Sequence, residues 1–157
     1  MTVIEEETPK KENWINPVQG MITSSCGVRE NPVLKKTELH DGLDIAVKKD
    51  TPVKATRSGT VTEVRKSSTL GNLVKFETED GFTIMYAHLN KALVQEGQKV
   101  AQGETVALSG DTGLVTGPHL HYSVWKKDML IDPMQFVYLE YTDEVKEEYA
   151  ARGVPYY

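Results

Sequence analysis

The strongest constraint on the fold is a series of short runs, rich in Val, Thr, Ile, Tyr and Phe, that are separated by glycines. No helical pattern of ~10–15 residues lies between the runs, and a Glu-Asp-Gly turn at residues 79–81 is typical of a β-hairpin. Many short strands with glycine turns predict an all-β domain, built as an antiparallel sandwich or open barrel. The expected strands are residues 21–24, 43–47, 59–65, 72–78, 82–88, 104–109 and 119–125.

The two ends of the chain differ from this β-rich part. Residues 1–12 hold four Glu, two Lys and few apolar side chains, so we expect a flexible acidic leader there. In residues 140–157, Asp143 can cap a helix, acidic residues follow it, and Gly153 can end it, which predicts a short helical tail. The expected organisation is therefore the leader 1–12, one domain over 13–139, and the tail 140–157.

Charge and cysteine content exclude several classes of protein. The net charge of −5 lies in the two ends, because the domain over 13–139 carries 14 acidic and 14 basic residues. We expect no nucleic-acid partner, because no basic patch is present, and no membrane insertion, because no long apolar run exists. A single Cys excludes an intrachain disulfide framework and a zinc ribbon with several cysteines.

The histidines are few, at positions 40, 88, 119 and 121, and two of them are one residue apart. His119 and His121 flank Leu120 in a β-like run. Residues i and i+2 of a strand point to the same face, so both imidazoles are expected to project together. Neutral imidazole is the commonest metal ligand in proteins, and the pair therefore indicates a candidate divalent-cation site.

A second candidate metal motif reads His40-Asp41-Gly42-Leu43-Asp44. Gly42 argues against a helix, so we expect His40 to lie in a loop that leads into the strand 43–47. Together with a second histidine, His40 and Asp44 would form the three-ligand set of a catalytic zinc, with the fourth position left for water. Asp41 is expected to be solvated.

His88 stands alone at the end of an expected strand and has no chelating neighbour in the sequence. If it points into the same groove, it supplies an imidazole that does not bind the metal. Such a group suits the transfer of a proton from an activated water to a leaving amine near pH 7.

At these residues the sequence resembles the LytM/lysostaphin-type zinc metallopeptidases, a family that cleaves peptidoglycan. The resemblance covers roughly residues 14–137, and its motifs are specific in combination. They are the entry segment 14–29, His40-x-Gly42-x-Asp44, the hairpin from Gly71-Asn72 to Tyr86-Ala87-His88-Leu89, Ser109-Gly110-x-Thr112-Gly113, Thr116-Gly117-Pro118-His119-Leu120-His121, and Asp132-Pro133.

The resemblance implies the antiparallel duplicated hybrid motif fold, with a groove that holds one zinc ion. His40, Asp44 and His121 correspond to the metal ligands of the family. His88 and His119 correspond to the two catalytic histidines that do not bind zinc. The implied reaction is hydrolysis of peptide bonds in peptidoglycan. Residues 31–39 contain no aromatic side chain, although the glycyl-glycine-cleaving branch has a Tyr there, so the resemblance does not extend to that specificity.

Other functions remain open at this stage. A zinc-bearing domain of this family can serve as a binding module of a cell-division or sporulation complex, with an envelope protein as its partner. A carrier module on a related β core is disfavoured, because no lysine stands at an exposed hairpin tip. Peptidoglycan as substrate implies an extracytoplasmic location, and the leader is compatible with a linker that follows a removed anchor or signal. A phage lysin is the other possibility.

Overall fold

The computed structural model describes residues 13–30, 35 and 37–137. The expected leader and the expected helical tail lie outside the described residues. Within them the chain forms twelve strands and one 3-10 helix, η3 (Pro133–Phe136), so the all-β prediction is confirmed. No helix in this part of the chain is long and apolar enough to span a membrane.

The strands are short at both ends of the described chain and long in the middle. They are β1 (Met21–Ser24), β2 (Gly27–Glu30), β3 (Thr37–His40), β4 (Leu43–Ala46), β5 (Pro52–Lys54), β6 (Gly59–Ser67), β7 (Gly71–Glu77), β8 (Phe82–Ala92), β9 (Lys99–Val100), β10 (Thr105–Ser109), β11 (Leu120–Lys126) and β12 (Met129–Ile131).

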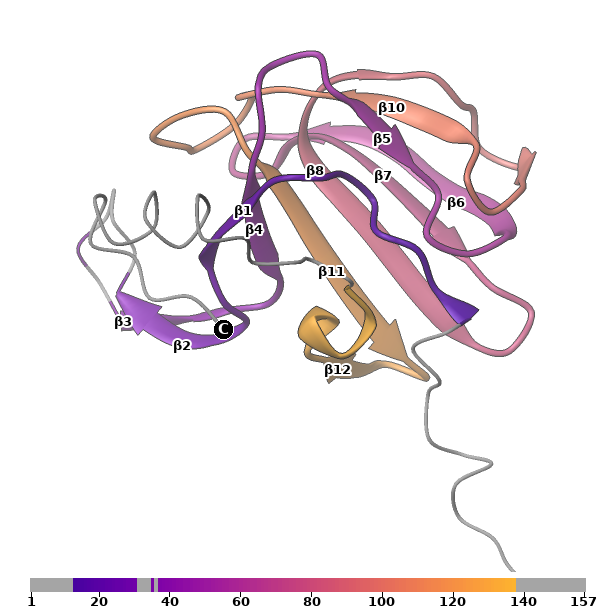
Figure 1. Cartoon of the computed structure of the whole chain (residues 1–157), viewed down its shortest axis with the longest axis horizontal. Coiled ribbons are helices and arrows are strands. Elements are labelled where there is room, and N and C mark those ends of the chain that lie inside the picture. Colours follow the sequence, from indigo (N-terminus) through magenta and orange to yellow (C-terminus); the bar gives the residue numbers. More distant parts are fainter. Residues whose placement is uncertain (1–12, 31–34, 36, 138–157) are drawn as a thin grey trace, which may run out of the picture.

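Ten of these strands form one antiparallel sheet, in the order β1-β4-β11-β8-β7-β6-β9 along its main path. β10 pairs with both β5 and β8, and β12 pairs with β11. β2 and β3 form a separate two-stranded sheet beside β1 and β4 (Figure 1). The strands β4, β11 and β8 are neighbours, and this adjacency pairs residues that are at least 34 positions apart in the sequence, such as His121 and Ala87.

All seven expected strands are present, with ends shifted by a few residues, whereas β2, β3, β5, β9 and β12 were not expected. The placement of His40 in a loop is wrong: His40 is the last residue of β3, because it pairs with Gly27 of β2. The strand expected from residue 119 begins at Leu120, and His119 forms an isolated bridge with Gly110.

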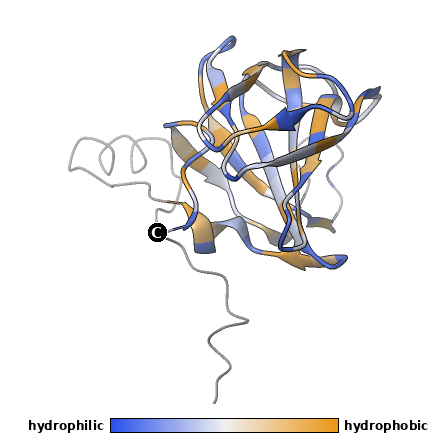
Figure 2. Cartoon of the chain, turned by 90° about the vertical axis from the view of Figure 1, so that its right-hand side faces the viewer, coloured by the Kyte–Doolittle hydropathy of each residue, from blue (hydrophilic) through white to orange (hydrophobic). Residues whose placement is uncertain are grey.

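Alternation along β11 separates the core from the functional face of the sheet. Leu120, Tyr122 and Val124 belong to the main hydrophobic core. Because side chains alternate along a strand, His121 and Ser123 point to the opposite face. Figure 2 shows hydrophilic and hydrophobic residues mixed along the strands.

The core is closed by aromatic stacking at the start and end of the described chain. The rings of Trp14 and Phe136 stack with centroids 3.9 Å apart, and Phe82 meets Trp14 edge to face at 4.9 Å. All three side chains are buried. Aromatic pairs of this kind contribute about 0.5–1.5 kcal/mol each beyond the area that they bury, so this contact fixes the two ends of the domain to the sheet.

Candidate metal centre

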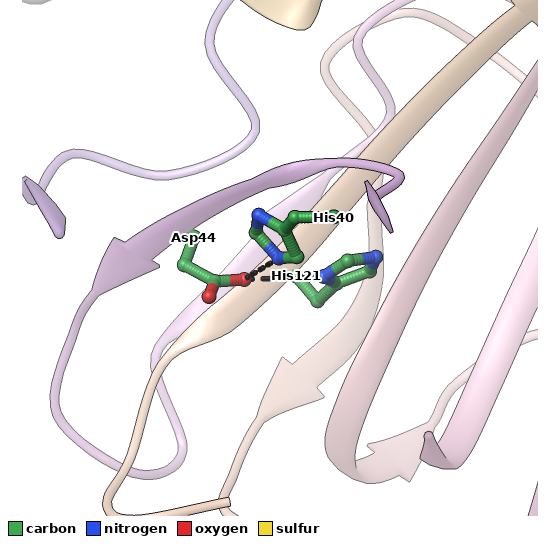
Figure 3. Close-up of side chains that lie close together, drawn as sticks. All are labelled: His40, Asp44 and His121. Atoms are coloured by element: carbon green, nitrogen blue, oxygen red, sulfur yellow. Dashed lines mark hydrogen bonds and ion pairs between the residues drawn. The ribbon is translucent and has the colours of Figure 1, made fainter. Parts of the chain in front are cut away.

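Strand pairing brings together the three residues that the family resemblance assigns to zinc. In the antiparallel pair of β4 and β11, Asp44 lies directly opposite His121. His40, at the end of β3, is four residues before Asp44 in the chain. Figure 3 shows the two imidazoles and the carboxylate facing one another. One ligand atom from each of the three buried side chains lies within 4.8 Å of the others.

Asp44 is the centre of this cluster. Its Oδ1 lies 3.2 Å from Nε2 of His40 and 3.1 Å from Nδ1 of His121. Burial disfavours the carboxylate, but hydrogen bonds from His121 and His40 outweigh burial and hold the pKa of Asp44 well below its usual range. The carboxylate is therefore ionised wherever the protein is folded near neutral pH.

In each of the two candidate ligand histidines, the ring nitrogen that does not face Asp44 is hydrogen-bonded to the protein. Nδ1 of His40 lies 2.9 Å from the carbonyl oxygen of Ser25 and donates to it, so Nε2 is the nitrogen that faces the cluster. Nε2 of His121 lies 3.0 Å from Oδ1 of Asp41 and 3.0 Å from Oγ of Ser123. The two histidines thus present different nitrogens, Nε2 and Nδ1, to the same carboxylate.

Asp41 departs from the sequence-based expectation. Its side chain is 44% exposed, as a solvated residue would be, but it also pairs with the buried His121. The hydrogen bond from His121 lowers the pKa of Asp41. Burial alone would lower the pKa of His121, yet the hydrogen bonds to Asp41 and Asp44 prevail and raise it to about 9. A proton therefore sits on His121 at neutral pH, and a cation that binds there must displace it.

His88 approaches the cluster from β8 in an unusual backbone conformation. Its φ of 60° is left-handed, which is uncommon for a residue other than glycine and concentrates at functional sites. Nδ1 of His88 lies 2.8 Å from the carbonyl oxygen of Thr112. Burial lowers the pKa of His88 to about 4, so the ring is neutral at physiological pH.

The loop that holds His88 is fixed by close backbone packing. Thr112 also donates from Oγ1 to the carbonyl oxygen of Leu89, at 2.6 Å. A Cβ on Gly113 would lie 2.5 Å from the backbone nitrogen of Gly71, so only glycine allows the two segments to approach this closely. The carbonyl of Thr112, which orients His88, is therefore held by its own loop and by the close approach of Gly113 to Gly71.

His119 completes the group from the loop that precedes β11. Its Nδ1 lies 3.0 Å from the carbonyl oxygen of Gly117, and its Nε2 lies 3.6 Å from Oδ1 of Asp44. The rings of His88 and His119 have centroids 4.9 Å apart. The structure thus places the four histidines of the expected site around the carboxylate of Asp44.

Sequence reasoning missed three residues that support this site. Ser123 had a detectable signal, because it is two residues after His121 on the same strand and therefore shares its face. Thr112 appeared only as part of a motif, and its carbonyl contact with His88 has no signature in side-chain chemistry. The contact of Asp41 with His121 spans 80 residues of sequence and depends on the pairing of β4 with β11.

The donor set indicates which metal the cluster could hold. Two imidazoles and a carboxylate, with no thiolate among the three, are a set of ligands that catalytic zinc sites use. The sequence profile of peptidase family M23 matches residues 38–133, and the chain belongs to this family.

The relatives of the chain agree with this assignment. Peptidoglycan DD-endopeptidase ShyA of Vibrio cholerae is 39% identical over 107 residues, which make up 68% of this chain and 25% of ShyA. The chain therefore spans about a quarter of the length of this relative.

Two solved structures share the fold. A zinc-containing peptidase from Vibrio cholerae has a TM-score of 0.71 and 36% identity, over 80% of this chain and 40% of that chain. The catalytic domain of lysostaphin from Staphylococcus simulans has a TM-score of 0.66 and 30% identity, over 73% of this chain and 90% of that domain.

Proposed function

We propose that this chain is a zinc-dependent endopeptidase that hydrolyses peptide bonds in bacterial peptidoglycan. The observation that carries the proposal is the convergence of His40, Asp44 and His121 on one point, with His88 and His119 beside them. Membership of peptidase family M23 supports the reaction class.

The three buried donors suit a single zinc ion. Nε2 of His40, the carboxylate of Asp44 and Nδ1 of His121 face one another, and together they provide one negative charge and two neutral nitrogens. When bound, zinc polarises a substrate carbonyl and lowers the pKa of a bound water. The protein fixes both ring orientations through the second nitrogen of each histidine.

His88 and His119 are placed to move protons. The Nδ1 of each donates to a backbone carbonyl, which leaves Nε2 as the nitrogen available to the site. The neutral His88 ring can accept a proton from the attacking water. The proton taken from the water can then pass to the leaving amine, either from His88 itself or through the neighbouring ring of His119, whose centroid lies 4.9 Å away.

The relatives support peptidoglycan as the substrate. ShyA is a peptidoglycan DD-endopeptidase, and the chain shares 39% identity with it across the matched region. Residues 31–39 contain no aromatic side chain, which favours the cross-links of stem peptides over glycine bridges. This substrate places the protein outside the cytoplasm, in the cell envelope or secreted, where another envelope protein could be its partner.

Digestion of purified peptidoglycan, followed by mass analysis of the released peptides, tests the proposal. The zinc-loaded chain is incubated with one wall that has direct stem-peptide cross-links and one that has glycine bridges. We expect cross-linked muropeptides to disappear from the first wall, and the His119→Ala variant to leave them intact. If the chain binds zinc but cuts neither wall, the alternative reading as an envelope binding module replaces the enzyme.

A further inference from the structure

The two candidate ligand histidines differ in what holds their second nitrogen. For His40 both partners are neutral: the backbone carbonyl of Ser25, at 2.9 Å, and the hydroxyl of Ser24, at 3.5 Å. For His121 the partners are the carboxylate of Asp41 and the hydroxyl of Ser123, both 3.0 Å from Nε2. A carboxylate is a stronger acceptor than a carbonyl, because its hydrogen bond is assisted by charge.

The backbone at Gly42 brings Asp41 to this position. A Cβ on Gly42 would lie 2.5 Å from Oγ of Ser123, 2.6 Å from the carbonyl oxygen of Tyr122 and 2.9 Å from Cε1 of His121. The segment that links β3 to β4 therefore passes directly against β11, with no space for a side chain. The preceding residue, Asp41, contacts Nε2 of His121, while Nδ1 of the same ring faces Asp44.

We propose that Asp41 is a positioning residue for the metal centre: its carboxylate holds the proton of His121 on Nε2, so that the lone pair of Nδ1 points at the ion. The proposal rests on the proposed zinc site but not on the proposed substrate. The sequence His-Asp-Gly-Leu-Asp then has two functional carboxylates. Asp44 is a ligand itself, and Asp41 orients His121, a ligand on β11.

The pairing affects metal binding in two ways. Neutral imidazole can carry its proton on either nitrogen, and only the form with the proton on Nε2 can bind a metal through Nδ1. A carboxylate partner selects this form and makes Nδ1 a stronger donor, and loss of such partners typically weakens metal binding by about 10–100-fold. Ser123 can accept the same hydrogen bond, but it has no charge, so its contribution is smaller.

Zinc affinity, measured by competition with a chelating indicator at fixed pH, tests the proposal on the full chain. We expect Asp41→Ala to bind zinc about 10–100-fold more weakly than the wild type. Asp41→Asn keeps an acceptor oxygen but loses the charge, so its zinc affinity should lie between those of the wild type and Asp41→Ala. Ser123→Ala should lose less affinity than Asp41→Ala. If Asp41→Ala folds and binds zinc as tightly as the wild type, the proposal is wrong.

The control is Asp128→Asn, which removes the same charge from an exposed turn at the far end of β11 and should leave zinc affinity unchanged. An equal loss in this variant would mean that net charge, rather than the contact, sets the affinity, and would overturn the proposal. If Asp41→Ala does not fold, Asp41→Asn decides alone: weaker binding supports the proposal, and binding at the wild-type level overturns it.

A second readout reports the proton itself. In the zinc-loaded wild type, we expect NMR to detect a low-field proton on Nε2 of His121 that exchanges slowly with water. In Asp41→Ala this signal should move upfield or be lost by exchange, and an unchanged signal would contradict the proposal. Neither readout requires hydrolysis, so a chain that binds zinc without cutting peptidoglycan loses the proposed function but leaves this inference standing. A wild type that binds no zinc overturns both.

Discussion

The two kinds of histidine at this site are held by different parts of the fold. His40 lies at the end of β3 and His121 lies on β11, and each turns one ring nitrogen toward Asp44. The second nitrogen of each also has a protein partner, and both side chains are buried. This half of the site has its hydrogen bonds made within the protein.

His88 and His119 are held by the loop that runs between β10 and β11. Nδ1 of His88 is bonded to the carbonyl of Thr112, and Nδ1 of His119 is bonded to the carbonyl of Gly117. In each histidine the loop holds Nδ1, and Nε2 remains available for proton transfer. On the proposed function, the strands hold the two histidines that bind the metal, and the loop orients the two that exchange protons.

The largest expected effect separates the two pairs by metal content. His121→Ala removes one of three donors, and two protein ligands rarely hold zinc firmly, so we expect zinc to fall from about one ion per chain to nearly none. The measurement is elemental analysis after dialysis, with His119→Ala as the matched control that should keep its zinc. Unchanged zinc in His121→Ala would contradict the assignment of the ligands.

The next effect separates the pairs by activity. In His119→Ala and in His88→Ala, we expect zinc to be retained and peptidoglycan hydrolysis to fall by about 10²–10⁴-fold, because a positioned proton donor or acceptor is lost. Rates are measured on purified muropeptides with zinc in excess. If hydrolysis remains at the wild-type level in both variants, neither ring takes part in proton transfer.

A smaller effect tests whether the loop positions His88. Thr112→Val keeps the shape of the side chain but removes the hydroxyl that binds the carbonyl of Leu89. Because small displacements of a catalytic group are costly, we expect about a tenfold lower rate with zinc binding unchanged. Thr116→Val, at an exposed position of the same loop, is the control and should retain full activity. Equal rates in the two variants would show that the hydroxyl of Thr112 is dispensable.

The smallest effect is on stability, and it has opposite signs for His88 and His121. In the zinc-free chain the pKa of His88 is lowered from 6.5 to about 4, so its contribution is present above pH 6.5 and is lost as the pH falls toward 4. The pKa of His121 is raised to about 9, so its contribution is present below pH 6.5 and is lost as the pH rises through 9.

Thermal unfolding in the presence of a chelator, recorded between pH 4 and 10, measures these slopes. In the plot of unfolding temperature against pH, we expect His88→Gln to flatten the acidic limb and His121→Gln to flatten the alkaline limb. The alkaline limb should remain in His88→Gln. If each variant changes both limbs equally, the two histidines do not differ in the way that we describe.

The sequence predicted the strands that carry strong local patterns and missed those that depend on pairing. β8 and β11 combine β-branched and aromatic residues over seven or more positions. By contrast β9 has two residues, and it is a strand only because it pairs with β6. His40 was expected in a loop because Gly42 follows it, but pairing with Gly27 extends β3 to include it.

The positions of the site residues could be predicted from the sequence, because the family resemblance supplied them. The orientation of their side chains could not. Neither the left-handed φ of His88 nor the carbonyl of Thr112 beside it has a side-chain signature. The contact between Asp41 and His121 depends on the close packing of Gly42 against β11, which only the folded sheet shows.

X-ray absorption spectroscopy at the zinc edge tests the central claim most directly, because it counts the imidazoles bound to the metal. The account expects one zinc per chain with two imidazole nitrogens, from His40 and His121, and oxygen ligands at ~2.0–2.2 Å from Asp44 and water. His88→Ala and His119→Ala should give the same spectrum. Three or four imidazoles in the wild type, or the loss of one in either variant, would contradict the division of the four histidines into a binding pair and a proton-transfer pair.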